Sequence, residues 1–390
     1  MESGKFKHGK HVLILEGNCK QSLPFIRGFK QLGCEVSVLC GSRLDCAYAS
    51  QLPDHKILGV CDYSKPLASE NYIVQLIRSG SYDLVFPVFD FSARILAKHK
   101  KELSDYAVIY ANDYDAFERA YDKNTVMRKC MESGIPCPTT IFHAQSPEDI
   151  LNAGIRFPII MKPRRMYGAR GFHRFNSPVE MREYLKEHSP DLTDCVIQEF
   201  IPEGSELCCA VIFIDRDGEI KSSYSYISEH VYPKYGGTST LNGVIDRPDA
   251  QEYCERLGKQ MGLRGIIGVD YMIDRMDQQC KILEINVRAV HGIAIGFFFG
   301  VDHARQVYED AFGLPVTKMK INKTDTAVRI LQTDMLWFLS SKDRLQKMPK
   351  KLGYRRTKEQ MFFVDDPLPW FSYLINGLWT FKKKMREKRQ

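Results

Sequence analysis

Short apolar runs alternate with helical patterns through the first 110 residues of the chain. The runs, each four or five residues long, are 12–15, 36–40, 56–60, 84–88 and 107–110. Between them, 22–32 and 71–80 carry apolar residues at the spacing of one helix face. Strands that alternate with helices pair in parallel, because each helix returns the chain to the same end of the sheet. The pattern therefore predicts a parallel-sheet α/β domain over residues 1–118.

The rest of the chain predicts helices mixed with antiparallel strand pairs. Apolar spacing predicts one long helix over 113–134, which Pro136 and Pro138 end. The turn residues Asp217-Gly218 predict a hairpin, and two further matching runs predict a second one. The expected strands are 157–162, 195–200, 207–215, 219–225, 268–273 and 281–286. The predicted fold class is thus α/β at the N-terminus, followed by α+β.

Composition and hydropathy exclude several classes of protein. Apolar residues make up 44% and charged residues 26% of the 390-residue chain, as in ordinary globular proteins, which excludes disorder. No apolar run approaches the roughly 18 residues that a membrane span needs. The basic segment 1–10 is followed only by the apolar run 12–15, which is too short for a signal peptide, so we expect a cytoplasmic protein. Glu16-Gly17-Asn18-Cys19-Lys20 after the first strand is not Gly-x-Gly-x-x-Gly, which argues against NAD binding.

The positive charge of the chain is concentrated at its C-terminus. Residues 342–390 contain 14 Lys or Arg against 5 Asp or Glu, whereas the first 341 residues contain 41 against 43. A nearly neutral body argues against nucleic-acid binding. Residues 367–381 are rich in aromatic side chains, and Lys382-Lys383-Lys384-Met385-Arg386 follows them. Two interpretations stay open: peripheral contact of 367–390 with anionic lipid at the inner face of the membrane, or a helix docked on the protein itself.

Polar side chains at alternate positions of one predicted strand form the strongest chemical signal. Glu284, Asn286 and Arg288 project from one strand face, because residues two apart point the same way. Asp270 lies on the strand predicted to pair with it. Two carboxylates and an amide oxygen suit Mg²⁺, which prefers oxygen ligands and keeps substrate phosphates. An arginine beside them suits a transferring phosphoryl group. The alternative is a hairpin face whose charges are solvated.

Two weaker signals precede this one. Lys162 ends an apolar strand and leads into Arg164-Arg165-Met166-Tyr167-Gly168-Ala169-Arg170-Gly171, a loop whose amides and basic side chains suit phosphate oxygens. Alone, such a lysine is more often one that caps a strand and reaches solvent. The segment 198–206, from Gln198 to Glu206, is a strand end with a nearby carboxylate, and it suits a base edge and ribose hydroxyls.

Taken in this order, the three segments resemble the ATP-grasp superfamily, in its carboxylate–amine ligase branch, as in D-alanine–D-alanine ligase and the carbamoyl phosphate synthetase large subunit. The resemblance implies a domain that precedes the grasp over 1–118 and a small lobe with a phosphate flap over 119–198. It further implies a large lobe with the metal site over 199–320, followed by a small basic extension over 321–390.

The resemblance also implies a role for each matching residue. Phosphate contacts fall to Lys123, Lys162 and the flap, with Arg170 and Gly171. Adenine is read by the backbone of Glu199, Phe200 and Ile201, and ribose by Glu206. Two Mg²⁺ ions, with Mn²⁺ as an alternative, are held by Asp270, Glu284 and Asn286. Arg288 and Lys162 are the implied catalytic residues.

The implied activity is ATP-dependent ligation. A carboxylate is phosphorylated by ATP, and an amine or similar nucleophile attacks the acyl phosphate, on a small molecule or a cell-envelope precursor. The implied partners are small-molecule substrates, together with a second copy of the chain. The competing hypothesis is an ATP-binding sensor or scaffold without ligase activity. His291 and the loop 232–240 have open roles, either in contacting substrate or in structure.

Overall fold

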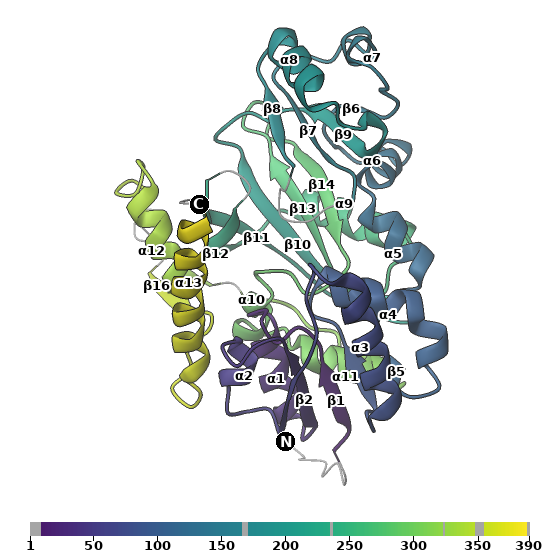
Figure 1. Cartoon of the computed structure of the whole chain (residues 1–390), viewed down its shortest axis with the longest axis vertical. Helices are drawn as coiled ribbons and strands as arrows, with labels where there is room; N and C mark the ends of the chain where they lie inside the picture. Colours follow the sequence, from purple (N-terminus) through teal and green to yellow (C-terminus); the bar gives the residue numbers. More distant parts are fainter. Residues whose placement is uncertain (1–8, 166–170, 235–236, 323, 348–354, 388–390) are drawn as a thin grey trace.

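The computed structural model describes residues 9–165, 171–234, 237–322, 324–347 and 355–387, the last ten as backbone only. Within them, three sheets follow one another along the long axis of the molecule, with the small lobe at one end and the N-terminal sheet at the other (Figure 1). The predicted fold class is confirmed, since a parallel N-terminal sheet precedes two mainly antiparallel sheets.

The N-terminal domain is a five-stranded parallel sheet. Its strand order is β3 (His55–Leu58), β2 (Glu35–Cys40), β1 (His11–Ile14), β4 (Leu84–Phe86) and β5 (Val108–Ile109). Its helices are α1 (Ser22–Gln31), α2 (Cys46–Ala49), α3 (Pro66–Ser79) and α4 (Asp90–Leu103). Successive strand residues point to opposite faces, so Val12 packs with α1 on one face and Leu13 packs with α3 and α4 on the other.

The small lobe is a four-stranded antiparallel sheet covered by two helices. Its strand order is β6 (Thr140–Ile141), β9 (Cys195–Glu199), β7 (Ile159–Pro163) and β8 (His173–Phe175). The helices are α7 (Pro147–Asn152) and α8 (Pro178–His188). Ile150 of α7 and Met181 of α8 share one apolar cluster with Ile159 and Ile197 of the sheet.

The large lobe is built on a seven-stranded sheet. Its order is β14 (Cys280–Asn286), β13 (Gly265–Ile273), β10 (Glu206–Ile214), β11 (Ile220–Tyr232), β12 (Thr238–Ile245), β15 (Thr326–Arg329) and β16 (Arg356–Glu359). Both predicted hairpins are present, as the pairs β10–β11 and β13–β14. The large-lobe helices are α9 (Pro248–Gln260), α10 (Ala294–Phe298) and α11 (His303–Ala311).

The single helix predicted over 113–134 is wrong. Two helices occupy that range, α5 (Tyr114–Tyr121) and α6 (Lys123–Glu132), and the chain breaks between them at Asp122. The Asp122 backbone is extended (φ −85°, ψ 106°), and its carboxylate accepts hydrogen bonds from the N–H groups of Asn124 and Thr125. An aspartate that caps a new helix in this way ends the old one. The apolar spacing continues across the break, so periodicity alone does not reveal it.

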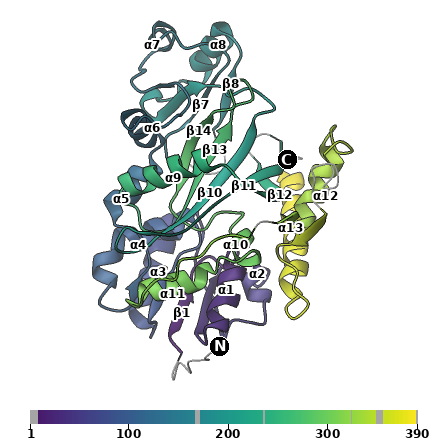
Figure 2. The ribbon, with the colours of Figure 1, turned by 180° about the vertical axis from the view of Figure 1, so that it is seen from behind.

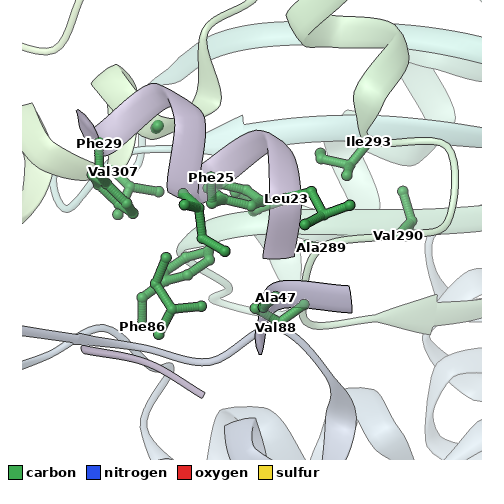
Figure 3. Packing of buried hydrophobic residues seen from close by; sticks show 14 of the residues in the cluster. Leu23, Phe25, Phe29, Ala47, Phe86, Val88, Ala289, Val290, Ile293 and Val307 are labelled. Carbon is green, nitrogen blue, oxygen red and sulfur yellow. The ribbon is translucent and has the colours of Figure 1, made fainter. Parts of the chain in front are cut away.

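The N-terminal domain and the large lobe share one hydrophobic core. Figure 3 shows Leu23 of α1 facing Val290 and Ile293, which follow β14, and Phe25 and Phe29 of the same helix belong to the same apolar cluster. These five side chains are at most 5% exposed. Burying apolar surface is worth roughly 25 cal/mol per Å², so this shared core fixes the N-terminal domain firmly against the large lobe.

The C-terminal extension packs on the N-terminal domain. Its elements are α12 (Leu331–Ser340), β16 and α13 (Leu368–Glu387), and α12 and α13 lie side by side in both views (Figures 1 and 2). Asp366, just before α13, accepts hydrogen bonds from Ser50 Oγ at 2.5 Å and from the Gln51 N–H at 2.9 Å. Ser372 Oγ of α13 donates to the Leu44 carbonyl at 2.7 Å. The described helices include none with the length and apolar character needed to cross a bilayer.

Asp366→Ala should loosen this packing. The carboxylate is buried, and its loss leaves the Ser50 hydroxyl and the Gln51 N–H without their acceptor, so the free energy of unfolding should fall by about 1–3 kcal/mol. Asp365→Ala is the matched control, because that neighbour pairs with Arg27 at an exposed position. Urea denaturation of the full chain measures both, and equal effects would refute the buried anchor.

Candidate active site

The β13–β14 ribbon brings the predicted polar residues together. Asp270 pairs directly with Glu284, and Gly268 pairs with Asn286. Asn286 Nδ2 donates to Asp270 Oδ2 at 2.8 Å, and Arg288 Nη2 donates to Asn286 Oδ1 at 3.1 Å. Ile285 and Val287 point to the opposite side and are buried in a separate apolar cluster. The alternation expected along this strand is therefore present, and its polar face is only partly exposed.

Two lysines from different elements face the carboxylates. Lys123 begins α6, is 7% exposed, and places Nζ 3.2 Å from Glu284 Oε2. Lys162 lies in β7, close enough to Glu284 and Lys123 for the charges of both to act on its ammonium. Loss of solvation lowers the pKa of Lys162 to about 8, although the charge of Glu284 opposes that shift. The small lobe and the large lobe thus meet at this cluster of opposite charges.

The two carboxylates titrate differently, for a physical reason. Burial raises the pKa of Asp270 to about 6, and the neighbouring charge of Glu284 adds to that rise. Burial also opposes ionisation of Glu284, but the charges of Lys123 and Lys162 outweigh it and keep its pKa below the usual value. A divalent cation would favour the ionised form of both groups. The oxygen atoms of Asp270, Glu284 and Asn286 therefore suit Mg²⁺, with the lysines suited to phosphate oxygens.

Asp122 organises the phosphate side, and sequence reasoning missed it. Its carboxylate caps α6, so it fixes the helix end that carries Lys123. The same carboxylate accepts from Arg164 Nη2 at 2.5 Å and from Arg165 Nη2 at 3.0 Å. The Lys123 N–H donates to the Arg164 carbonyl at 3.2 Å. An aspartate directly before a helix-starting lysine is the sequence signal that identifies such a cap.

Only part of the predicted flap lies within the described residues. Arg164 and Arg165 leave β7 and are held by Asp122, so they do not extend freely over the site. Arg170 lies outside the described residues. Gly171 has a left-handed φ of +69°, and a Cβ there would come within 2.9 Å of the Pro163 ring, so glycine is required where the segment turns back.

The predicted hinge lies where β9 ends, between the two lobes. The Glu199 N–H donates to the Thr139 carbonyl, and the Phe200 N–H donates to the Pro158 carbonyl, each at 3.0 Å. Glu199 Oε1 accepts from Lys281 Nζ at 3.2 Å. Within the described residues, the Ile201 N–H has no protein acceptor. Of the three hinge N–H groups, that of Ile201 is therefore the one available to a base edge.

Glu206 and the loop 232–240 occupy different surroundings. Glu206 begins β10 and is exposed, as a group that contacts ribose has to be before the nucleotide arrives. Lys234 is also exposed, with Nζ 3.7 Å from Glu203 Oε2, whereas Ser239 is buried in β12 and bonded to Asn242. Residues 235 and 236 lie outside the described residues. Ser239 therefore has a structural role.

Arg288 connects the β13–β14 ribbon to the N-terminal domain, a contact that was not predicted from the sequence. Its Nε donates to Asp90 Oδ2 at 2.9 Å, and its guanidinium lies 4.3 Å from the centre of the Phe89 ring. Asp90 begins α4, beyond the end of β4. Arg288 is 8% exposed, and three hydrogen bonds, to Asp90, Asn286 and the Ala289 carbonyl, together with the Phe89 ring hold its buried guanidinium at the junction of the two domains.

The chain resembles curated proteins over part of their length. It is 26% identical to the carbamoyl phosphate synthase large chain of Thermus thermophilus over 189 residues, which cover 45% of this chain and 18% of that protein. It is 24% identical to the D-aspartate ligase of Enterococcus faecium over 290 residues, covering 67% of this chain and 66% of that enzyme. The chain thus spans less than two thirds of the length of these curated relatives.

Solved structures share the fold at low sequence identity. Biotin carboxylase from Campylobacter jejuni superposes with a TM-score of 0.66 at 16% identity, covering 81% of this chain and 74% of that one. N5-carboxyaminoimidazole synthetase from Staphylococcus aureus gives 0.63 at 18% identity, with 83% and 82% covered. The family model of the ATP-grasp domain matches residues 120–291, which include both lysines and the complete metal ribbon. Residues 120–291 of this chain are therefore similar to the ATP-grasp domain.

Proposed function

We propose that the protein is an ADP-forming ligase that uses ATP to activate a carboxylate for attack by an amine or similar nucleophile. The observation that carries the proposal is the facing set of Asp270, Glu284, Asn286 and Arg288 on one ribbon and Lys123 and Lys162 opposite. D-aspartate ligase and D-alanine–D-alanine ligase among the relatives, the latter 25% identical over 179 residues, support the same reaction class.

In this proposal, each end of the nucleotide has its own residues. Lys123, Lys162 and the flap with Arg170 and Gly171 hold the phosphates. Asp270, Glu284 and Asn286 hold two Mg²⁺ ions, or Mn²⁺, which neutralise phosphate charge. The backbone of Glu199, Phe200 and Ile201 contacts adenine, and Glu206 contacts ribose. The ATP-grasp match over residues 120–291 and the position of Lys123 beside Glu284 support these assignments.

The chemistry needs positioning rather than a protein nucleophile. A substrate carboxylate oxygen attacks the γ-phosphorus of ATP, ADP leaves, and an acyl phosphate forms. The nucleophile then attacks the acyl carbon and inorganic phosphate leaves. Arg288, fixed by Asp90 and Asn286, stabilises the negative charge of the phosphoryl group, and Lys162 does so from the other lobe. Preorganised charges in a dry site are effective because they cost no reorganisation during the reaction.

Glu284→Gln should abolish Mg²⁺-dependent ATP turnover while the protein stays folded. The amide keeps the shape but removes the charge that faces the metal position, and a loss of at least about 100-fold is expected. Glu219→Gln, at an exposed turn, is the matched control. ADP release with a panel of acids and amines measures the effect, and turnover near the wild-type rate in Glu284→Gln would refute the metal assignment. Nucleotide binding without ADP release by the wild-type protein would favour the sensor hypothesis.

We further propose that the C-terminal extension contacts an anionic lipid surface from the cytoplasmic side, and that the protein forms a homodimer. Three apolar side chains of α13 are exposed, Leu368, Phe371 and Ile375, at 45%, 49% and 52%. Exposed apolar residues of the neighbouring α12 are Met335, Leu336, Phe338 and Leu339. Ser372, by contrast, is buried against the protein and Trp370 is partly buried, so the helix is docked on one side and apolar on another. Lysines 382–384 follow in sequence, and apolar groups beside basic ones favour the lipid interface.

The triple change Lys382→Glu, Lys383→Glu and Lys384→Glu should weaken vesicle binding. Flotation with phosphatidylcholine vesicles, with and without phosphatidylglycerol, measures it, and binding should require the anionic lipid and weaken at high salt. Lys101→Glu, Lys186→Glu and Lys259→Glu together make the same charge change at exposed sites elsewhere. Equal flotation of the two triple variants would contradict the proposal.

A further inference from the structure

Several buried polar side chains have an atom with no hydrogen-bond partner among the described residues, and His291, Gln360 and the nearby Lys20 are the ones that concern the acceptor side. Lys20, in the turn between β1 and α1, is 5% exposed; its carbonyl accepts from the Leu23 N–H, but its ammonium makes no hydrogen bond or ion pair with a described residue. His291 Nδ1 and Gln360 Oε1 are also buried without a partner. The groups belong together, because Gln360 Nε2 donates to the His291 carbonyl at 3.1 Å and the charge of Lys20 acts on His291. They come from the N-terminal domain, the segment after β14 and the C-terminal extension.

Lys20 is a buried cation whose partner is absent. Burial lowers its pKa to about 8, so the ammonium stays largely protonated at neutral pH. The carboxylate that acts on it is Glu359, whose oxygens already accept from the N–H groups of Leu331 and Met361 at 2.8 and 3.4 Å. Burial raises the pKa of Glu359 to about 7, which further weakens it as a counter-charge. An unpaired buried charge is costly, and proteins keep such groups mainly where a ligand completes them.

The surroundings of Lys20 favour an anion. The helix α1 begins at Ser22, directly after this turn, and has no acidic residue in its first turn, so its positive dipole end is uncompensated. Burial, with Lys20 and Arg288 nearby, keeps the pKa of His291 well below its usual value, so the imidazole is neutral and can donate from one nitrogen. The Arg288 guanidinium is a further positive charge beside the β13–β14 ribbon, where it donates to Asn286.

We propose that Lys20, His291 and Gln360 line the acceptor end of the active site and bind a second anionic group of the substrate, whose reacting carboxylate lies at Arg288. The substrate class is therefore a small acid with two anionic groups, such as a dicarboxylate. This inference rests on the ligase function proposed above. The C-terminal extension contributes directly, because Gln360 follows β16, and the site is incomplete without it.

Calorimetric titration of the full chain in the presence of MgADP tests the inference. Succinate and aspartate are the dianionic probes, and acetate and glycine are the probes with one carboxylate. Wild-type protein should bind the first pair more tightly, and Lys20→Met should weaken that binding by at least about tenfold, since a buried charge loses its partner. Lys101→Met, at an exposed lysine of α4, should change nothing. Equal binding of the dicarboxylates by Lys20→Met, or no binding of any acid by the wild type, overturns the inference.

MgADP affinity keeps this result separate from the proposed function. It should be unchanged in Lys20→Met, and its absence in the wild type would refute the nucleotide site rather than the acceptor site. Thermal unfolding without added multivalent anions gives a second test. Lys20→Met should raise Tm, because it removes an unpaired buried ammonium, whereas a residue with a structural partner would lower Tm when replaced. A lower Tm in Lys20→Met overturns the inference.

Discussion

The site depends on holding two carboxylates side by side on a sheet face. Asp270 and Glu284 are directly paired across β13 and β14, and like charges at this separation repel. Lys123 and Lys162 compensate Glu284, and Asn286 and Arg288 continue the polar contacts from Asp270. Because the compensating groups come from α6, β7 and the end of β14, the two lobes have to assemble before the carboxylates are balanced. The negative charges of the site are therefore balanced only when the lobes of this chain are assembled.

The sequence predicted those features of the site that depend only on the local geometry of a strand. The two-residue period places Glu284, Asn286 and Arg288 on one face, and no tertiary contact is needed to see it. Lys162 was suggested by the strand and basic loop around it, whereas Lys123 came from the family resemblance, and the structure places both near Glu284. Their functional roles, like the domain boundaries, stay predictions.

Contacts between segments that lie far apart in the chain could not be predicted from the sequence. Asp122 capping α6 while holding Arg164, and Asp90 holding Arg288 across 198 positions, depend on how elements pack and leave no periodic signal. The unpartnered state of Lys20 is equally invisible, because it requires knowing that the turn is covered by the C-terminal extension. Burial and the absence of a counter-charge are properties of the assembled chain.

The attachment of the C-terminal extension to the N-terminal domain has a consequence for how substrate specificity can change. Asp366 and Ser372 attach this segment to the N-terminal domain through side chains that touch none of the nucleotide residues. Under the function proposed above, exchanging the segment that contributes Gln360 would change which acid is selected without altering the residues proposed to bind phosphate. Grafting the corresponding segment of a relative onto this scaffold would be the economical route to a ligase of new specificity.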